Sequence, residues 1–202
     1  MECSDDCPRP TLPEEMPVMV LPDCHLFPGC LLPLYIYEER YRKMLAHALD
    51  SNRMFCIGNR EGEGEDAPIS PHSTAGLVRA CVRQKDGTSH LLLLGLQRIK
   101  LGNWVQTKPF RVARIEPLET VLGDPEDQQR LKNEALGLFS AASEQAKELR
   151  KVLEENDDAE MVCDVLSYHF TRCPKLQQRL MGEPSLVKRY EMVIQALKKT
   201  NC

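Results

Sequence analysis

Residues 26–45 read LFPGCLLPLYIYEERYRKML, and this stretch decides the fold because an apolar, extended pattern changes there into a helical one. Pro28 and Gly29 form a turn signal, since proline fixes φ and glycine accepts positive φ. Apolar residues on both sides of this turn predict two strands, over about residues 18–21 and 31–36. The stretch therefore predicts a strand, a turn and a second strand that leads into a helix.

The residues after this stretch predict a short helix and then a series of strands. Apolar residues at helical spacing indicate a helix over about residues 38–51, and Asp86-Gly87 is a strong hairpin signal between two β-rich runs. The four consecutive leucines at 91–94 are typical of a strand that is buried on both faces. Residues 58–73 are expected to form a loop. Strands are expected over Met54–Ile57, Gly76–Arg83, His90–Leu96, Arg98–Leu101, Trp104–Gln106 and Phe110–Ile115.

The second half of the chain has a helical pattern. Asp124-Pro125 is a helix start, with aspartate at the N-cap and proline at the first helical position. Apolar residues from Leu131 to Leu153 then recur at steps of three and four, which predicts one long helix of about 30 residues. Three shorter helices are expected after it: one from Asp157-Asp158, one from near Pro174 and one over about Ser185–Lys199.

These patterns predict the α+β class, with a β-rich part followed by a separate helical part. Residues 1–16 contain prolines, acids and cysteines and are expected to form a flexible N-terminal tail. Residues 17–118 are expected to form the β subdomain. Residues 119–202 are expected to form the helical subdomain, with one long helix and three shorter ones.

Several short motifs follow one another along the chain in a fixed order. They begin with Leu26-Phe27-Pro28-Gly29, Leu32-Pro33-Leu34 and Arg40-Tyr41-Arg42-Lys43-Met44, and continue with Gly76–Val82, Asp86-Gly87, Leu92–Arg98, Phe110–Ala113, Asp157–Leu166, Gln177–Met181 and Lys188–Glu191. Together these motifs resemble the N-terminal, substrate-binding domain family of Lon proteases, over about residues 17–198.

This resemblance implies a PUA-like β pseudo-barrel followed by a C-terminal α-helical bundle. It also implies a protein-binding module that recognises unfolded polypeptides or exposed apolar segments, as an adaptor or regulator of proteolysis. The chain stops where the ATPase would begin in full-length Lon. A free-standing member of bacterial type, without ATPase and peptidase domains, is therefore expected, with a polypeptide or one specific protein as its partner and no cofactor.

Composition and charge bear on the remaining classes. A hydrophobic content of 42% predicts a folded core, and no apolar run approaches the roughly 18 residues that a membrane helix needs. The N-terminus is acidic and is not typical of a signal peptide, so a cytoplasmic location is expected. The net charge is −4, and neither half is basic, which disfavours nucleic acid. An RNA-binding PUA-like module is the alternative, and it would need the cations Arg79, Arg83, Lys85, Arg98 and Lys100 to converge on one face.

The chain is not expected to be an enzyme. It carries no phosphate-binding loop, nucleophile elbow, zinc-protease motif or dinucleotide fingerprint. His169 and Cys173 are four residues apart and would be close on a helix, but a catalytic pair needs a third group that orients the base. A surface or packing role is therefore favoured for both residues.

The nine cysteines do not indicate a metal site. Their odd number, without a secretion signal, argues for reduced thiols. Cys3, Cys7, Cys24, His25 and Cys30 have the chemistry of zinc ligands, but no second tight Cys-x-x-Cys pair accompanies them. Cysteine in an apolar stretch also behaves as a small hydrophobic residue, so no metal is predicted.

Trp104 is the single tryptophan and the one candidate partner-binding residue. It lies beside an expected turn at Gly102-Asn103, and an exposed tryptophan is a frequent anchor in protein interfaces. A half-buried packing role is the alternative, and it is the favoured one.

Overall fold

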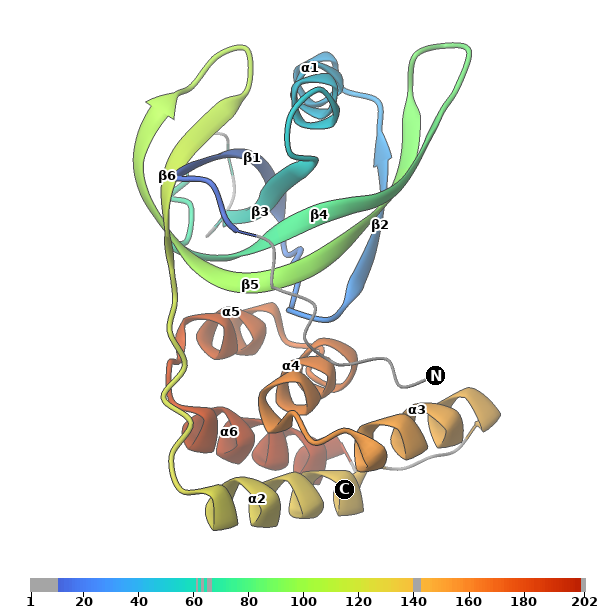
Figure 1. Cartoon of the computed structure of the whole chain (residues 1–202), viewed down its shortest axis with the longest axis vertical. Helices are drawn as coiled ribbons and strands as arrows, with labels where there is room; N and C mark the ends of the chain where they lie inside the picture. Colours follow the sequence, from blue (N-terminus) through green and yellow to red (C-terminus); the bar gives the residue numbers. More distant parts are fainter. Residues whose placement is uncertain (1–10, 61, 63, 65–66, 140–142, 201–202) are drawn as a thin grey trace.

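The computed structural model describes residues 11–60, 62, 64, 67–139 and 143–200. Its first half contains six strands and one helix, and its second half contains helices alone (Figure 1). The elements of the first half are β1 (Glu15–Pro22), β2 (Leu31–Ile36), α1 (Glu39–Leu49), β3 (Met54–Arg60), β4 (His72–Arg83), β5 (Ser89–Gln106) and β6 (Arg111–Pro117). Those of the second half are α2 (Pro125–Leu138), α3 (Glu144–Glu155), α4 (Ala159–Phe170), α5 (Pro174–Gly182) and α6 (Leu186–Thr200). The α+β class is confirmed.

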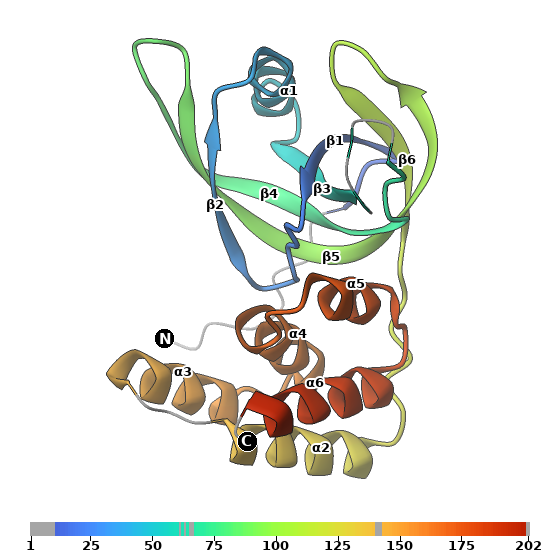
Figure 2. The ribbon, with the colours of Figure 1, turned by 180° about the vertical axis from the view of Figure 1, so that it is seen from behind.

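The six strands form one sheet that closes on itself. Their order is β2-β5-β4-β3-β1-β6, and β5 also pairs with β6, which closes the sheet into a barrel. β1 and β3 run parallel, and the other pairs are antiparallel. The 18-residue strand β5 makes this closure possible, because its first half pairs with β2 and its second half with β6. β2 is therefore an edge strand that extends the barrel wall on one side (Figure 2).

The Pro28-Gly29 turn fastens the start of β2 to β5. Gly29 has φ +75°, and its N–H donates to the Gly95 carbonyl at 2.9 Å. The Gly95 N–H donates in turn to the Cys30 carbonyl at 2.9 Å. The predicted turn is thus present, and the left-handed conformation at Gly29 is the reason that glycine suits it.

Each half has its own core, and the Pro28-Gly29 turn reaches from one half into the other. One barrel cluster lies under α1, whose Tyr41, Met44 and Leu45 are buried, and a second lies between the opposite strands. The helical cluster includes Phe27 and Cys30 from the turn. In α6 the residues expected to face inward are all buried: Leu186, Tyr190, Val193, Ile194 and Leu197. Helices α4 and α5 form the layer next to the barrel, and α2 and α6 lie beyond them (Figure 1).

The expected tail over residues 1–16 is wrong at its C-terminal end. β1 begins at Glu15, and Met16 is fully buried in the barrel core. Leu12 packs against the same core. Because both side chains pack into this core, the ordered structure of the barrel starts before Pro17. The first ten residues of the expected tail lie outside the described part of the chain.

The expectation that the leucines at 91–94 are buried on both faces is also wrong. Leu91 and Leu93 are buried, whereas Leu92 is 39% exposed and Leu94 is half-buried. Successive side chains of a strand point to opposite faces, and no element of the described chain covers the outer face at Leu92. The run of leucines therefore marks an exposed apolar surface.

The single long helix expected from Asp124 to Leu153 is two helices. α2 ends at Leu138, and Phe139 takes an extended conformation with φ −71° and ψ 110°. Leaving the helix lets Phe139 bury its ring against Phe170, with ring centres 4.4 Å apart. α3 then begins at Glu144, where the Ser143 hydroxyl accepts from the Ala146 N–H and caps the helix. Tertiary packing and a local cap thus override the continuous apolar stripe.

Candidate functional site

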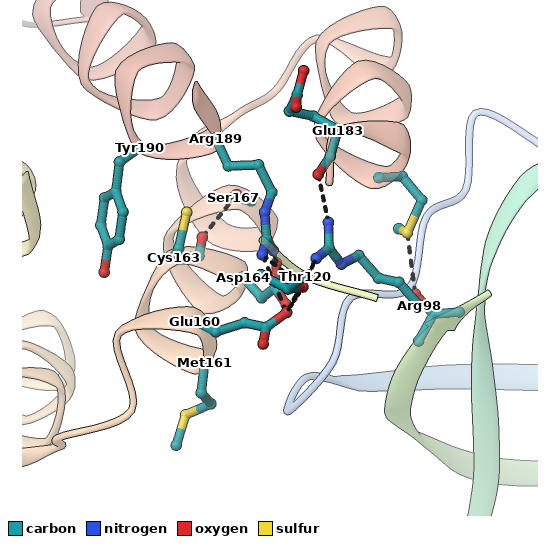
Figure 3. Close-up of polar contacts among 12 residues, drawn as sticks. Arg98, Thr120, Glu160, Met161, Cys163, Asp164, Ser167, Glu183, Arg189 and Tyr190 are labelled. Atoms are coloured by element: carbon teal, nitrogen blue, oxygen red, sulfur yellow. Dashed lines mark hydrogen bonds and ion pairs between the residues drawn. The ribbon is translucent and has the colours of Figure 1, made fainter. Parts of the chain in front are cut away.

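A cluster of buried charges joins the barrel to the helices (Figure 3). Arg98 of β5 and Arg189 of α6 both contact the same carboxylate oxygen of Glu160 on α4, at 3.0 and 3.1 Å. Arg189 also donates to Asp164, one turn further along α4, at 2.7 Å. Both guanidinium groups and the Asp164 carboxylate are buried. Residues from three separate elements therefore meet in one charge cluster.

Neutral groups add further hydrogen bonds to this charge cluster. Arg98 donates to the Glu183 carbonyl at the end of α5, at 2.9 Å, and to the Thr120 hydroxyl at 2.5 Å. The Thr120 hydroxyl also donates to Glu160. A buried ion pair costs less desolvation energy when its remaining donors and acceptors are matched. Here the matching is partial, because Asp164 Oδ2 and the Nε atoms of Arg98 and Arg189 have no hydrogen-bond partner among the described residues. The cluster thus ties β5 to α4, α5 and the segment before α2.

The two carboxyl groups of the charge cluster respond differently to their surroundings. Burial raises the pKa of Asp164 to about 6, and the attraction of Arg189 and Arg98 opposes this shift. Burial also acts to raise the pKa of Glu160, but the Thr120 hydroxyl and the two guanidinium groups outweigh it and lower that pKa. The two guanidinium groups are thus balanced by two carboxyl groups, and the net charge of the cluster is close to zero. The charge cluster is suited to holding the halves together rather than to capturing a charged ligand.

The basic residues expected for RNA binding do not form one surface. Arg98 is fully buried in the charge cluster and is not available to a phosphate. Arg79, Arg83, Lys85 and Lys100 are exposed, but Lys100 pairs with the far end of β4 at His72, whereas Arg83 lies at the other end of that strand. The alternative based on convergence of these five residues is therefore wrong.

The histidine and cysteine candidates are distributed over separate environments. His25 is buried and bonds to Gln178 at 3.0 Å, and burial raises the pKa of the Cys30 thiol to about 12. His169 lies in the last turn of α4, whereas Cys173 is exposed at the start of α5. Within the described residues no group of three or more His, Cys, Asp or Glu side chains is placed to hold a metal ion. Cys3 and Cys7 lie outside that part of the chain.

Trp104 lies on β5 and is 37% exposed. The Arg111 guanidinium lies over its ring, 5.2 Å from the ring centre, on the neighbouring strand β6. The neighbouring Val105 is exposed as well. The ring is thus partly exposed, and its role as a partner anchor stays a prediction.

A contiguous set of apolar side chains covers the outer side of the edge strand and its neighbours. Tyr35 is 47% exposed, and its ring stacks on His90 with centres 4.7 Å apart and on Tyr37 with centres 5.7 Å apart. Val82 is 61% exposed and pairs with His90 in the sheet. We call this set the apolar sheet face, and its members are Leu31, Pro33 and Tyr35 of β2, Ala80 and Val82 of β4, and His90 and Leu92 of β5.

The apolar sheet face exists because β2 is apolar on both of its sides. Leu32, Leu34 and Ile36 point into the barrel core, while the alternate side chains face outward. A shallow hollow of about 420 Å³ lies over the central part of this surface. A sheet with one solvated face normally alternates apolar and polar residues, so an exposed apolar face points to a binding surface. None of these residues was a sequence-based candidate, although the absence of any polar residue between positions 30 and 37 is a signal for them.

The architecture is that of a small β barrel fixed to a helical bundle. The family model described as "ATP-dependent protease La (LON) substrate-binding domain" matches residues 15–199. The chain therefore belongs to the Lon substrate-binding domain family. The match is to this domain and not to the peptidase or ATPase parts, and the family supports a protein-binding role.

Full-length Lon proteases are similar to this chain over part of their length. The Lon protease of Desulfosudis oleivorans is 27% identical over 146 residues, which cover 70% of this chain and 17% of the protease. The Lon protease of Escherichia coli K12 is 24% identical over 163 residues, which cover 77% of this chain and 21% of the protease. The chain thus spans about a fifth of the length of these relatives.

Two solved structures share the fold. The N-terminal domain of Mycobacterium avium complex Lon protease matches with a TM-score of 0.73 and 15% identity, over 91% of this chain and 98% of that domain. A Lon N-terminal domain protein from Xanthomonas campestris matches with a TM-score of 0.66 and 18% identity, over 90% and 97% of the two chains. Of the helices that the structure describes here, none is long and apolar enough to cross a membrane.

Proposed function

We propose that this chain is a non-catalytic polypeptide-binding module and that its apolar sheet face contacts exposed apolar segments of unfolded proteins. The observation that carries the proposal is the stacked row of Tyr37, Tyr35 and His90 beside the exposed Val82 and Leu92. Folded proteins rarely leave such a contiguous apolar surface open to water unless it binds something.

The spacing of the apolar sheet face suits an extended chain. Leu31, Pro33 and Tyr35 alternate along β2, so their side chains recur about every 7 Å. An extended polypeptide presents alternate side chains at the same interval. Burial of apolar side chains in such a register is tolerant of sequence, which is what a module that recognises many unfolded chains requires.

Membership of the Lon substrate-binding domain family supports a place in proteolysis, as an adaptor or as a regulator. A module of this kind would deliver an unfolded chain to a protease or withhold it. The cytoplasmic location stays a prediction.

The test is binding of a fluorescently labelled, reduced and alkylated polypeptide, measured by fluorescence anisotropy at two salt concentrations. Val82→Asp should weaken binding about tenfold or more, because it places a charge in the apolar contact. Val152→Asp is the matched control, since Val152 is 58% exposed on α3 and is not part of the apolar sheet face.

Equal loss in the two variants, or no binding by the wild-type protein, contradicts the proposal. A labelled single-stranded RNA is measured in parallel. RNA binding that falls steeply with salt, without binding of the polypeptide, would favour a nucleic-acid module instead.

A further inference from the structure

The apolar sheet face has two different ends. At one end the Leu31 carbonyl accepts a hydrogen bond from the Tyr168 hydroxyl of α4, at 3.3 Å, so this end abuts the helical half. At the other end β2 stops at Ile36, and Tyr37 is exposed beside the β4–β5 hairpin and α1. The hairpin extends past α1 at the far side of the barrel from the helices (Figures 1 and 2).

A basic groove opens at this far end. It has a volume of about 520 Å³ and runs between α1 and the hairpin. Tyr37 lies at its rim and also stacks on Tyr35, so the groove and the apolar sheet face share a boundary. The cations of this groove are Arg42 and Lys43 of α1 and Arg83 of β4, and the exposed Lys85 follows Arg83 in the hairpin.

The four cations differ in how far neighbouring groups already engage them. Lys43 is paired with Glu39 at 2.7 Å, but Arg42, Arg83 and Lys85 have no ion pair within 4.0 Å in the described part of the chain. Arg42 instead lies across the hairpin turn, where a Cβ on Gly87 would fall 2.0 Å from its Nη2. Its guanidinium also helps to lower the pKa of Asp86, after the larger effect of the Thr88 N–H and hydroxyl.

This local positive charge contrasts with the chain as a whole. The net charge is −4, yet the residues from 24 to 37 contain no Asp, Glu, Lys or Arg, and those from 79 to 90 contain Arg79, Arg83 and Lys85 against Asp86 alone. Asp86 is already held by the Thr88 hydroxyl at 2.7 Å. The groove itself is lined by Arg42, Lys43 and Arg83 against the single acid Glu39, so the surface changes from apolar near Leu31 to net positive beyond Tyr37.

We infer that the preferred partner of the apolar sheet face is an extended polypeptide segment in which a cluster of acidic residues adjoins the apolar residues. The apolar part lies over Leu31, Pro33 and Tyr35, and the acidic part enters the basic groove beyond Tyr37. About six residues of extended chain span this distance. The inference rests on the proposed function. It adds a preference for acidic residues and states which part of the bound segment lies at which end of the surface.

The same cations would attract RNA phosphates, but the rest of the surface favours a polypeptide. Leu31, Val82 and Leu92 are aliphatic and offer no hydrogen bond to a base edge. Aromatic stacking of bases needs open ring faces, whereas Tyr35 is stacked between His90 and Tyr37. RNA is therefore an outcome of the test and not the expectation.

The test uses three labelled peptides that share one half of alternating leucine and tyrosine and differ in four following residues, which are glutamate, glutamine or lysine. Anisotropy titrations at low salt should give an affinity for the glutamate peptide about fivefold tighter than for the glutamine peptide, because a few exposed ion pairs add modestly. The lysine peptide should bind more weakly than the glutamine peptide. At high salt the three affinities should converge, because exposed charges are then screened.

The variant Arg83→Glu/Lys85→Glu should remove the preference for glutamate while leaving the affinity for the glutamine peptide unchanged. The control Arg172→Glu/Lys175→Glu makes the same change of charge at exposed sites on the helical half and should retain the preference. Equal affinity for the three peptides in the wild-type protein overturns the inference and leaves the proposed function intact. Failure of all three peptides to bind overturns both the inference and the proposed function. If single-stranded RNA displaces the glutamate peptide and binds more tightly than it does, the assignment to an acidic polypeptide is overturned.

Discussion

Arg98 on the barrel strand β5 and Glu160 on helix α4 lie 3.0 Å apart, and their ion pair crosses the boundary between the two halves of the molecule. Arg189 reaches the same carboxylate oxygen from α6, at 3.1 Å, and binds Asp164 as well. The barrel and the helices are thus joined by ion pairs whose two partners lie on different elements. Interruption of this charge cluster should therefore affect the stability of the whole chain.

Arg189→Met should lower the free energy of unfolding by about 3–5 kcal/mol, because it leaves the Asp164 carboxylate buried without its ion-pair partner. Urea unfolding monitored by circular dichroism at pH 7 measures the change. Lys198→Met is the control, since it removes the exposed ion pair with Glu134. Such a pair contributes about 0–1 kcal/mol. A loss for Arg189→Met as small as that of the control would show that the buried pair does not hold the halves together.

The raised pKa of Asp164 predicts a dependence of stability on pH. Burial raises this pKa from 3.8 to about 6, so the folded state holds the proton more tightly than the unfolded state does. The stabilisation from this group is fully present below pH 3.8 and is lost as the pH rises through about 6. Relative to Asp164→Asn, the wild-type protein should therefore lose about 2 kcal/mol of unfolding free energy between pH 4.5 and pH 7.

Urea unfolding of both proteins at several pH values measures this difference, and the subtraction removes the groups that they share. The lowered pKa of Glu160 has the opposite sign, with stability lost as the pH falls, and it is present in both proteins. A difference that stays constant with pH, or that changes in the other direction, would show that Asp164 is ionised in the fold at its ordinary pKa.

The sequence was sufficient for the parts of the fold that depend on local geometry. The Pro28-Gly29 turn, the hairpin at Asp86-Gly87 and the helix start at Asp124 are present where their residue types predict them, because φ preferences and helix caps act over a few residues. The motifs from residue 26 onward also indicated the family, since their order reflects the path of the chain through the barrel.

Features that depend on distant contacts could not be predicted in the same way. Arg98, Glu160 and Arg189 look like ordinary surface charges in the sequence, and only the docking of α4 and α6 on β5 brings them together. The break between α2 and α3 depends on the contact of Phe139 with Phe170, 31 positions later. The apolar sheet face escaped detection because a run of leucines has the same pattern whether or not another layer covers it.

Gly95→Ala should destabilise the protein by about 3 kcal/mol or more, because a Cβ there would lie 2.1 Å from the Phe27 carbonyl oxygen and would force two backbones apart. Gly137→Ala is a matched control, since a Cβ at this position in α2 meets nothing within 4 Å. It should be neutral or should stabilise the helix by about 0.5–1 kcal/mol. Thermal and urea unfolding measure both variants. Equal effects in the two variants would contradict the close packing of the Pro28-Gly29 turn on β5.

Gln178→Ala should destabilise the protein by about 1–3 kcal/mol, because it removes the partner of two buried polar side chains. Gln178 of α5 bonds to His25 at 3.0 Å and accepts from the Asn59 amide at 3.2 Å, and its own amide donates to the His72 carbonyl at 3.2 Å. These bonds join α5 to the barrel at a place separate from the charge cluster. Gln195→Ala, at an exposed position of α6, is the control and should change the unfolding free energy by less than about 0.5 kcal/mol.

Comparison of Gln178→Ala with Arg189→Met extends this prediction. If the Gln178 hydrogen bonds and the charge cluster both hold the helical half on the barrel, either variant should increase the hydrogen exchange of the α5 amides. The β3–β4 amides should stay protected until global unfolding. Faster exchange throughout the barrel in Gln178→Ala would instead mean that His25 and Asn59 stabilise the sheet itself, and that α5 depends on the charge cluster alone.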